Sequence, residues 1–505
     1  MKVRLCGTRG ASAPTTPPEN PAIPLARRCR SMTFDDYRSF DALGLAQLIR
    51  KREVSRQEVM DAALARLEAV NPTINAVTYL HAPALAADAP PVGEDGPFAG
   101  IPYFIKDLHA PVKGMPLTHG SRLFAGQVFD FDSETVARLR RAGFVLMGRT
   151  NSPEFGMNVS TEPVVAGPTR NPWNLAHIAG GSSGGAGAAV ASGIVPAAHA
   201  TDSGGSIRIP ASCNGLVGLK PTRALLAYGP HRGDAAHGIS HEHAVTRSVR
   251  DCAAILDATA GPDVGAPYFT PRPALSYLEG ITRPPGRLRV AFTSTDFSGQ
   301  PVHAECRAAV EKTAALLESL GHHVEQRAPQ FDHDALLKAG LVIMLTGLAA
   351  HVDAREKQLG RPAAPDDLEP ITHAAIAHGR TISGMQYAAQ FGLINREVRS
   401  IGRFFEGCDI LVTPTMAAPP PLLGTLSTRI TDLDQFMANT YGVAPFTTTF
   451  NATGQPAISL PLHWSADGLP VGVQLAGRFG ADDQLLALAA QLEQAAPWFN
   501  RVPPL

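Results

Sequence analysis

Apolar residues recur along the chain with two different periods, and segments of the two kinds alternate. Where apolar positions lie three and four apart, the pattern predicts an amphipathic helix. Short unbroken apolar runs between turn residues predict buried strands. The pattern predicts helices over Leu43–Arg52, Ser55–Val70, Ser133–Ala142, Gly184–Ser192 and Asp483–Gln494, and strands over Gly100–Leu108, Gly143–Gly148, Ile194–Thr201, Ile410–Val412, Ala457–Leu462 and Val471–Leu475. Helices that alternate with strands in this way are typical of an α/β fold.

Local signals set several of the expected boundaries. Ser55 and Glu58 form a capping-box pattern at the start of one helix, and Asn71-Pro72 predicts its end. Asp482 is the expected cap of the last helix. Residues 84–98 are rich in Ala and Pro and predict a loop, whereas residues 330–445 are mostly helical. Neither a repeat nor a linker divides the chain, so residues 32–505 are expected to form one domain.

The first 31 residues differ in composition from the rest. They hold six basic residues against one acidic residue, and five prolines. They contain no continuous apolar core of the signal-peptide kind. We therefore expect residues 1–31 to be a disordered extension, with Met32 as an alternative start. A transit or twin-arginine export segment is the weaker alternative.

Charge and cysteine content narrow the class of partner. Lys plus Arg (44) nearly equal Asp plus Glu (45), a balance that favours a small neutral ligand over nucleic acid or an anionic membrane. The six cysteines are scattered without a C-x-x-C pair, which is typical of a reducing compartment and predicts a cytoplasmic protein. No apolar run reaches the ~20 residues that span a bilayer. The best candidate, Leu341–Ala350, is interrupted by Thr346 and Gly347 and predicts a buried helix.

A histidine cluster raises the question of a metal site. It comprises His231, His237, His241 and His243. The two histidines of His241-Glu242-His243 are two positions apart, so they would point to opposite sides of a helix and could not share one ion. We therefore interpret this cluster as a solvated loop, and the sequence predicts no metal.

Two serines beside glycine pairs carry the candidate chemistry. Ser182 lies in Gly180–Gly185 and Ser206 follows Ser203-Gly204-Gly205, 24 positions further along. Paired glycines let backbone amides turn toward one point, where they can stabilise a developing negative charge. Alone, each segment is equally compatible with a Gly-Ser turn, a flexible linker or an anion cradle. A phosphate cradle of the P-loop kind would also need a lysine that is missing here.

Lys106 supplies a possible base for these serines. An isolated lysine is usually a surface charge, but Ile101, Tyr103, Phe104 and Ile105 surround this one in an apolar strand. A buried lysine must be paired or neutral, and desolvation lowers its pKa toward the range of a general base. A serine becomes a nucleophile only when such a group removes its proton. Together the three residues indicate acyl transfer without a histidine.

At this point the residues resemble the amidase signature family, from about Phe40 to the C-terminus. The matching motifs are Lys106, Gly180–Gly185, Asp202–Pro210, Gly218–Thr222, Arg170–Asn174 and Phe450–Pro456. The resemblance implies a single α/β/α sandwich, with a large mixed, mostly parallel sheet and helices on both faces. It also implies a Ser-cisSer-Lys triad, with Ser206 as nucleophile, Ser182 as relay and Lys106 as base. Backbone amides of Ser203, Gly204, Gly205 and Ser206 would form the oxyanion hole, and neither a metal nor an organic cofactor is implied.

The resemblance also points to a substrate pocket and to departures from the family pattern. The pocket residues it implies are Met157, Asn158, Ser160, Met344, Phe450 and Asn451. Ser203 stands where the family often has Thr or Ile, and Asn214 stands where it usually has Cys, with Cys213 one place earlier. Arg208 is expected to brace the serine loop through Asp202 rather than to bind substrate.

The implied function is a stand-alone amidase that hydrolyses a carboxamide, with anilides, esters and carbamates as further candidates. The resemblance is strongest to broad-range bacterial amidases, near the hydrolases of cyclic nylon oligomers and the urethanases. Met344 replaces a substrate-side cysteine of the nylon branch, which argues against cyclic oligoamides. An amidase subunit of a tRNA-dependent amidotransferase is one alternative, and an anion-binding protein with glycine-rich loops is another. The expected partner is a small amide substrate, and the expected state is a monomer or homodimer.

Overall fold

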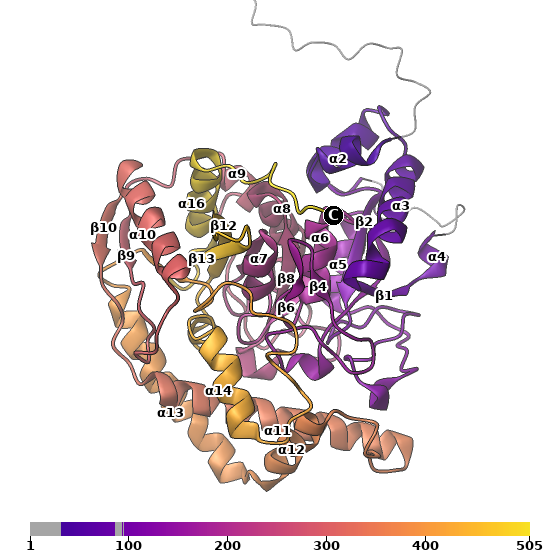
Figure 1. The fold of residues 1–505 in the computed structure, drawn as a ribbon, viewed down its shortest axis with the longest axis vertical. Helices are drawn as coiled ribbons and strands as arrows, with labels where there is room; N and C mark the ends of the chain where they lie inside the picture. The colour runs from indigo at the N-terminus through magenta and orange to yellow at the C-terminus, as the bar shows by residue number, and fades with distance from the viewer. Residues whose placement is uncertain (1–31, 86–92, 94) are drawn as a thin grey trace, which may run out of the picture.

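A computed structural model describes residues 32–85, 93 and 95–505 of the chain (Figure 1). The expected extension, residues 1–31, lies outside the described residues, as does part of the loop expected at 84–98. Within the described residues, one eleven-stranded sheet runs through the molecule in the order β1-β3-β2-β6-β8-β7-β12-β13-β11-β9-β10, and β4 and β5 form a separate pair. The strands are β1 Val77–Leu80, β2 Ile101–Lys106, β3 Phe144–Thr150, β4 Arg170–Asn171, β5 Asn174–Ile178, β6 Ala197–Asp202, β7 Val217–Lys220, β8 His241–Thr246, β9 Arg289–Phe292, β10 His323–Gln326, β11 Ile410–Pro414, β12 Ala457–Trp464 and β13 Pro470–Gly477.

The direction of the strands confirms a mixed sheet but corrects the expectation of a mostly parallel one. Strands pair in parallel in β3-β2-β6 and in β11-β9-β10. The six other pairings are antiparallel, and most of them join these two parallel groups through the middle of the sheet. Strands β12 and β13, which follow one another across the short segment 465–469, reverse direction because a hairpin connection requires it.

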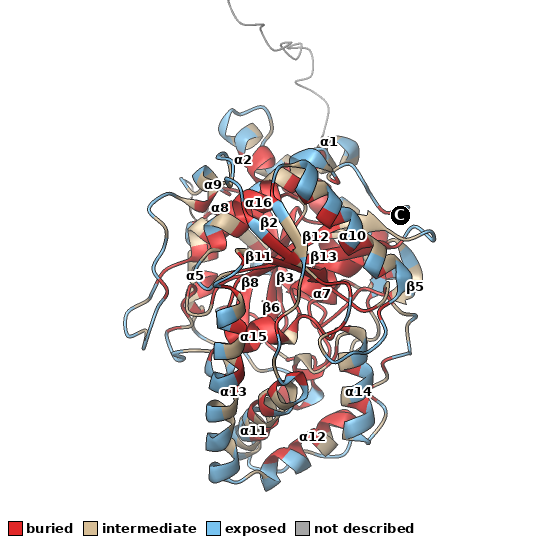
Figure 2. Ribbon diagram, turned by 90° about the vertical axis from the view of Figure 1, so that its left-hand side faces the viewer, coloured by how far each residue is buried: buried red, intermediate tan, exposed pale blue. Residues whose placement is uncertain are grey.

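Helices pack on both sides of the sheet and enclose its buried strands (Figure 2). They are α1 Phe34–Arg38, α2 Ala42–Arg50, α3 Arg56–Ile74, α4 Ala82–Leu85, α5 Glu134–Arg141, α6 Gly184–Ala191, α7 Arg208–Asn214, α8 Val249–Thr259, α9 Tyr277–Gly280, α10 Ala304–Ser319, α11 His333–Leu359, α12 Pro370–Thr381, α13 Gly384–Phe404, α14 Leu433–Val443, α15 Thr448–Thr453 and α16 Asp482–Ala495. One apolar core joins α2 and α3 to β2, β3 and β6, and another joins α8, α10 and α16 to β11–β13. These two cores hold the middle of the sheet, and therefore the ends of β2 and β6, in a fixed position.

The helices α11–α14 gather at the end of the molecule away from α2 and α3 (Figure 1). Of the described helices, α11 alone has the length and the mean hydropathy (1.8) that could cross a bilayer. In the structure, 33% of its most apolar 18-residue segment is buried. The sequence predicted a buried helix over Leu341–Ala350. The helix is longer, and the expectation of burial is wrong for most of this run, since only Ile343, Leu345 and Ala349 of its ten residues are buried. The longer helix packs against α12 and α13, and its apolar residues line a cavity that is described below.

Two expected helix boundaries are wrong for identifiable reasons. Helix α3 continues through Pro72 to Ile74 and ends on Asn75, which is left-handed at φ 50°. Proline at this position removes only one hydrogen bond, so a further half-turn is tolerated. Asp482 begins helix α16 instead of capping it, because its carboxylate accepts hydrogen bonds from the backbone and hydroxyl of Thr222.

Candidate active site

Lys106 lies at the last position of β2, a strand whose six residues are all buried. Its side chain is completely buried, and its Nζ lies 2.7 Å from Ser182 Oγ and 2.9 Å from Thr201 Oγ1. Burial lowers the pKa of Lys106 well below its usual value, and the charges of Asp202 and Glu242 only partly oppose this effect. A lysine in this setting can be neutral near pH 7 and can accept a proton from a hydroxyl.

Ser182 lies in the glycine-rich turn between β5 and helix α6. It is 2% exposed, and the peptide bond that joins it to Gly181 is cis. A Cβ on Gly181 would lie 2.6 Å from the backbone oxygen of Asn158 and 2.7 Å from the nitrogen of Ser160. Glycine is therefore required here, because the turn packs directly against another backbone segment. This packing holds the Ser182 hydroxyl against Lys106.

Ser206 lies in the turn between β6 and helix α7, and Asp202 and Arg208 fix that turn. The two side chains form a completely buried ion pair, with Arg208 Nε 2.9 Å and Nη2 2.8 Å from the Asp202 oxygens. Burial alone would raise the pKa of Asp202, but the Arg208 guanidinium holds it well below its usual range. Asn451 completes the network by donating to Asp202 Oδ1 at 2.8 Å. The expected bracing role of Arg208 is thus confirmed.

The amides of this turn are not equivalent. The Gly205 amide donates to Asp202 Oδ1 at 2.7 Å, and the Gly204 carbonyl accepts from Thr447 Oγ1 at 2.5 Å. Gly205 has φ +129°, and a Cβ there would lie 2.4 Å from Thr447 Oγ1, so only glycine fits. Ser206 is 9% exposed, and its hydroxyl has no hydrogen-bond partner among the residues that the structure describes. The turn therefore holds a hydroxyl without a partner of its own among these residues. Of the four amides expected to bind an oxyanion, that of Gly205 already donates to Asp202.

A cavity of about 430 Å³ opens in front of Ser182. Most of its wall is apolar, and helix α11 supplies the largest part. Its apolar lining comes from Leu108, Phe155, Met157, Leu341, Ile343, Met344, Leu345, Leu348 and Met437. Its polar lining comes from His109, Ser182, Ser203, Arg232, Asp234, His237, Ser240, His351 and Tyr387. The volume is within the range of small-molecule sites.

The structure places two of the six expected pocket residues on this cavity, Met157 and Met344. The other four have different roles, and Ser206 itself is not one of the lining residues. Asn158 donates to the Leu426 carbonyl at 2.7 Å, and Ser160 donates to Glu162 at 2.7 Å. Phe450 is completely buried in an apolar core. The Asn451 side-chain amide donates to Asp202, so these four side chains make contacts away from the cavity.

Sequence reasoning missed three histidines beside the cavity. The rings of His109 and His351 each lie within 5.4 Å of the ring of His119, measured between centroids. Burial lowers the pKa of all three, that of His351 to about 4. The positive φ of His109 (61°) and His119 (55°) is a structural signal, since such residues cluster at functional sites. The sequence holds no local pattern that would have linked the three.

The interpretation of the 231–243 histidines as a solvated loop is wrong in part. His241 and His243 lie in the buried strand β8, and their rings are enclosed by neighbouring strands and helix α8. Of the four histidines in this cluster, His237 is the one that lines the cavity. Among the described residues, no group of three His, Cys, Asp or Glu side chains is placed to hold a metal ion.

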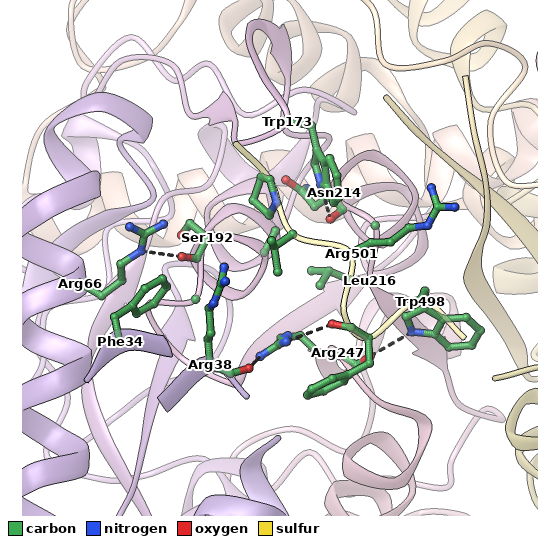
Figure 3. A pocket seen from close by; sticks show the side chains of 16 residues that line it. Phe34, Arg38, Arg66, Trp173, Ser192, Asn214, Leu216, Arg247, Trp498 and Arg501 are labelled. Carbon is green, nitrogen blue, oxygen red and sulfur yellow. Dashed lines mark hydrogen bonds between the residues drawn. The ribbon is translucent and has the colours of Figure 1, made fainter. Parts of the chain in front are cut away.

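A second pocket lies between the N-terminal helices and the C-terminal segment, far smaller at about 20 Å³ (Figure 3). Two of its four arginines bind backbone carbonyls across the pocket. Arg66 donates to the Ser192 carbonyl at 2.8 Å, and Arg247 donates to the Phe499 carbonyl at 3.1 Å. A space of this size holds about one water molecule. This pocket is a packed joint and is too small for a substrate.

Comparison with known proteins places this site in a family. The family model described as Amidase matches residues 58–486. The chain is 41% identical over 482 residues to 6-aminohexanoate-cyclic-dimer hydrolase of Paenarthrobacter ureafaciens, a match that covers 92% of this chain and 96% of that protein. A solved structure of 6-aminohexanoate cyclic dimer hydrolase superimposes with a TM-score of 0.86 at 39% identity, over 92% of this chain and 99% of the other.

A solved bacterial aryl acylamidase of the amidase signature family superimposes with a TM-score of 0.80 at 28% identity, covering 91% of this chain and 96% of that one. The matched residues include β2 with Lys106, the turn of Ser182 and the turn of Ser206. From this agreement of sequence, fold and site we conclude that the chain belongs to the amidase signature family and is a hydrolase of amide C–N bonds.

Proposed function

We propose that Ser206 is the nucleophile of this amidase, that Ser182 relays its proton and that Lys106 is the base. The observation that carries the proposal is the 2.7 Å contact between Lys106 Nζ and Ser182 Oγ in complete burial. Desolvation favours the neutral amine, and a neutral amine can accept a proton from Ser182. The same contact would be unproductive on an exposed lysine, which stays protonated at pH 7.

The reaction then proceeds in two halves. Ser206 Oγ bonds to the amide carbonyl carbon while its proton passes through Ser182 to Lys106. As the tetrahedral intermediate collapses, the C–N bond breaks and the proton returns through Ser182 to the leaving nitrogen. Water then attacks the acyl-enzyme along the same proton path. The second collapse releases the acid and restores the Ser206 hydroxyl and neutral Lys106.

The oxyanion of each intermediate needs donors near Ser206. We assign this role to the amides of Ser203, Gly204 and Ser206. The Gly205 amide was expected to join them, but its hydrogen bond to Asp202 makes it part of the brace. Donors held in place before the reaction need no reorganisation in the transition state, which is the source of their catalytic effect.

The cavity supports a small amide with an apolar acyl or aryl group as the substrate. Its α11 wall offers Leu341, Met344 and Leu348 beside Ser182. The related proteins named above act on a cyclic amide dimer and on aryl acylamides, and both substrates have large apolar parts. Anilides, esters and carbamates remain further candidates. We propose that the enzyme acts as a monomer or homodimer in the cytoplasm.

The decisive experiment pairs Ser206→Ala with Ser319→Ala, a serine at the end of helix α10 whose hydroxyl binds only the Leu316 carbonyl. A panel of p-nitroanilides, aliphatic amides and aryl carbamates first identifies an accepted substrate. Ser206→Ala is expected to abolish its hydrolysis, and Ser319→Ala to retain it. Hydrolysis by purified, folded Ser206→Ala would contradict the proposal. Turnover of glutamine or asparagine alone, with a co-purifying subunit, would instead favour the amidotransferase role.

A further inference from the structure

Glu242 is a buried carboxylate next to Lys106 that the reaction described above does not use. It lies on β8 directly opposite Thr201 of β6, and it is 6% exposed. Residues opposite one another on antiparallel strands share a face of the sheet. Thr201 Oγ1 is the second contact of Lys106 Nζ, at 2.9 Å. One cross-strand step therefore separates Glu242 from the lysine amine.

Within the described part of the chain, Glu242 lacks the arginine partner that the neighbouring carboxylate Asp202 has. Its one ion-pair contact among the described residues is His199, whose Nε2 lies 3.5 Å from Glu242 Oε2. The same residues bring no arginine or lysine nitrogen within 4.0 Å of it. Asp202, by contrast, is bound at both oxygens by Arg208. The charge of a buried carboxylate without a close arginine or lysine is poorly screened in the interior, so it acts on the Lys106 amine one cross-strand step away.

We propose that Glu242 is a positioning residue that sets the proton affinity of Lys106 through its charge across the strand from Thr201. The inference rests on the proposed role of Lys106 as base. A lysine in a purely apolar setting would lose so much basicity that it could no longer take a proton from a serine. Glu242 opposes that loss and keeps the amine a useful base near neutral pH.

The electrostatics agree with this geometry. Burial is the largest influence on Lys106 and lowers its pKa, while the charges of Asp202 and Glu242 raise it. Because Arg208 neutralises Asp202 at close range, the opposing charge that remains uncompensated is that of Glu242. Burial raises the pKa of Tyr228, and the charge of Glu242 adds to that rise, so Glu242 acts on a second neighbouring group as well.

Other charged and titratable groups lie near Lys106, and a substitution at Glu242 leaves their identity unchanged. Asp202 and Arg208 lie on β6 and helix α7, His109 lies after β2, and Arg149 on β3 donates to the Lys106 carbonyl at 3.3 Å. His199 faces Glu242 itself. A substitution at Glu242 therefore removes one charge from an otherwise constant setting.

The test measures the rate at which a fluorophosphonate modifies Ser206, as a function of pH, in the full-length protein. In the wild type this rate rises with pH as Lys106 loses its proton. Glu242→Gln is expected to move this rise to lower pH by about one unit, because loss of the negative charge makes the ammonium easier to deprotonate. Glu242→Asp keeps the charge and is expected to titrate close to the wild type.

Glu493→Gln is the matched control, since Glu493 is a half-buried glutamate on helix α16 that accepts from the Val249 amide, away from the site. It is expected to leave the pH profile unchanged. If Glu242→Gln folds poorly by near-ultraviolet circular dichroism, Glu242→Met removes the same charge without adding a hydrogen-bond donor.

Three outcomes decide the matter. A shift to lower pH in the neutral variants, with Glu242→Asp like the wild type, supports the proposal. A lower rate at every pH with an unmoved profile shows a merely structural role and overturns it. If the reagent fails to modify Ser206 even in the wild type, the proposed function fails first, and the role of Glu242 fails with it.

Discussion

Two regions of the molecule face each other across one cavity, and they are built on different principles. On one side, β2, β6 and the two serine turns hold polar groups that are almost all buried and bonded. Lys106, Asp202 and Arg208 are completely buried. On the other side, helix α11 presents apolar residues, several of them only half buried, and Gly347 in its middle has no neighbour within 4 Å of an added Cβ.

The difference separates the reaction from the choice of substrate. Buried polar networks tolerate little change, because each loss leaves an unpaired group in a low dielectric. A change in the size of one side chain in an apolar wall alters the preference between two substrates by only about 1–3 kcal/mol. We therefore expect the strand side to determine whether amides are cleaved, and the helix side to determine which ones.

The largest effect is expected at Lys106. Lys106→Met removes the proposed base, and we expect kcat/KM to fall about 1,000-fold, which corresponds to about 4 kcal/mol. Lys220→Met is the control, because Lys220 on β7 is equally buried but donates only to the Pro221 carbonyl at 2.8 Å. It is expected to keep at least a tenth of the activity. Equal losses in the two folded variants would show that burial of a lysine, rather than its contact with Ser182, is what matters.

The brace behind Ser206 is the next test. Asp202→Asn leaves the completely buried Arg208 without its counter-ion, and we expect the free energy of unfolding to fall by about 3 kcal/mol. Urea unfolding measures this loss. Asp409→Asn removes a carboxylate that pairs with the half-exposed Arg289 and Arg478, and should cost less than about 1 kcal/mol. If the two variants are equally stable, the strand side is not the rigid region that we describe.

Glu154 joins the two regions, and its protonation makes the junction sensitive to pH. It precedes the cavity residues Phe155 and Met157, and its Oε2 accepts from the Glu369 amide at the start of helix α12, at 2.8 Å. Burial raises the pKa of Glu154 to about 7, and the nearby charge of Glu369 adds to the effect. The folded protein therefore holds this proton more tightly than the unfolded chain does, where the pKa is about 4.3.

The sign of the pH dependence follows from that difference. The stabilisation by protonated Glu154 is complete below about pH 4 and is lost as pH rises through 7. Between pH 5 and pH 8 this term should lower the unfolding free energy by about 2 kcal/mol in the wild type, and not in Glu154→Gln. Urea unfolding of both proteins across this range gives the difference. Parallel pH profiles would mean that Glu154 does not titrate between the two regions.

The smallest effect is expected on the helix wall. Met344→Ala enlarges the cavity beside Ser182, and we expect about a tenfold loss in kcat/KM for the best apolar substrate, mostly in KM, with a gain for bulkier acyl groups. Met385→Ala, at an 85% exposed position on helix α13, is the control and should change neither constant. A loss in kcat alone, with KM unchanged, would place Met344 on the reaction side of the cavity.

The two regions also differ in how much the sequence could predict. The signals on the strand side are local. The apolar neighbours of Lys106 predict that it is buried, and the glycines beside Ser182 and Ser206 predict tight turns. That Lys106 and Ser182 act together was implied by the family resemblance, and the two side chains lie in contact. The strand ends nearby were also close to the observed ones, with β6 beginning at Ala197 rather than at Ile194.

The cavity wall could not be derived in the same way. Phe450 and Asn451 were expected in the pocket because they follow the motif, but packing turns them toward the core and toward Arg208. His109 and His351 come together from segments far apart in the chain, and nothing in either segment signals the other. The resemblance implied a mostly parallel sheet. The direction of each strand depends on its pairings with distant strands, which local sequence patterns do not contain, so the sequence could not correct this expectation.

The most direct test of the central claim is the mass of the protein after reaction with a fluorophosphonate or an activated ester. The account predicts one adduct, located on the peptide that contains Ser206, in wild type and in Ser319→Ala. It predicts no adduct in Ser206→Ala, and strongly slowed formation in Lys106→Met. An adduct on another residue, or unchanged modification of Ser206→Ala, would contradict it.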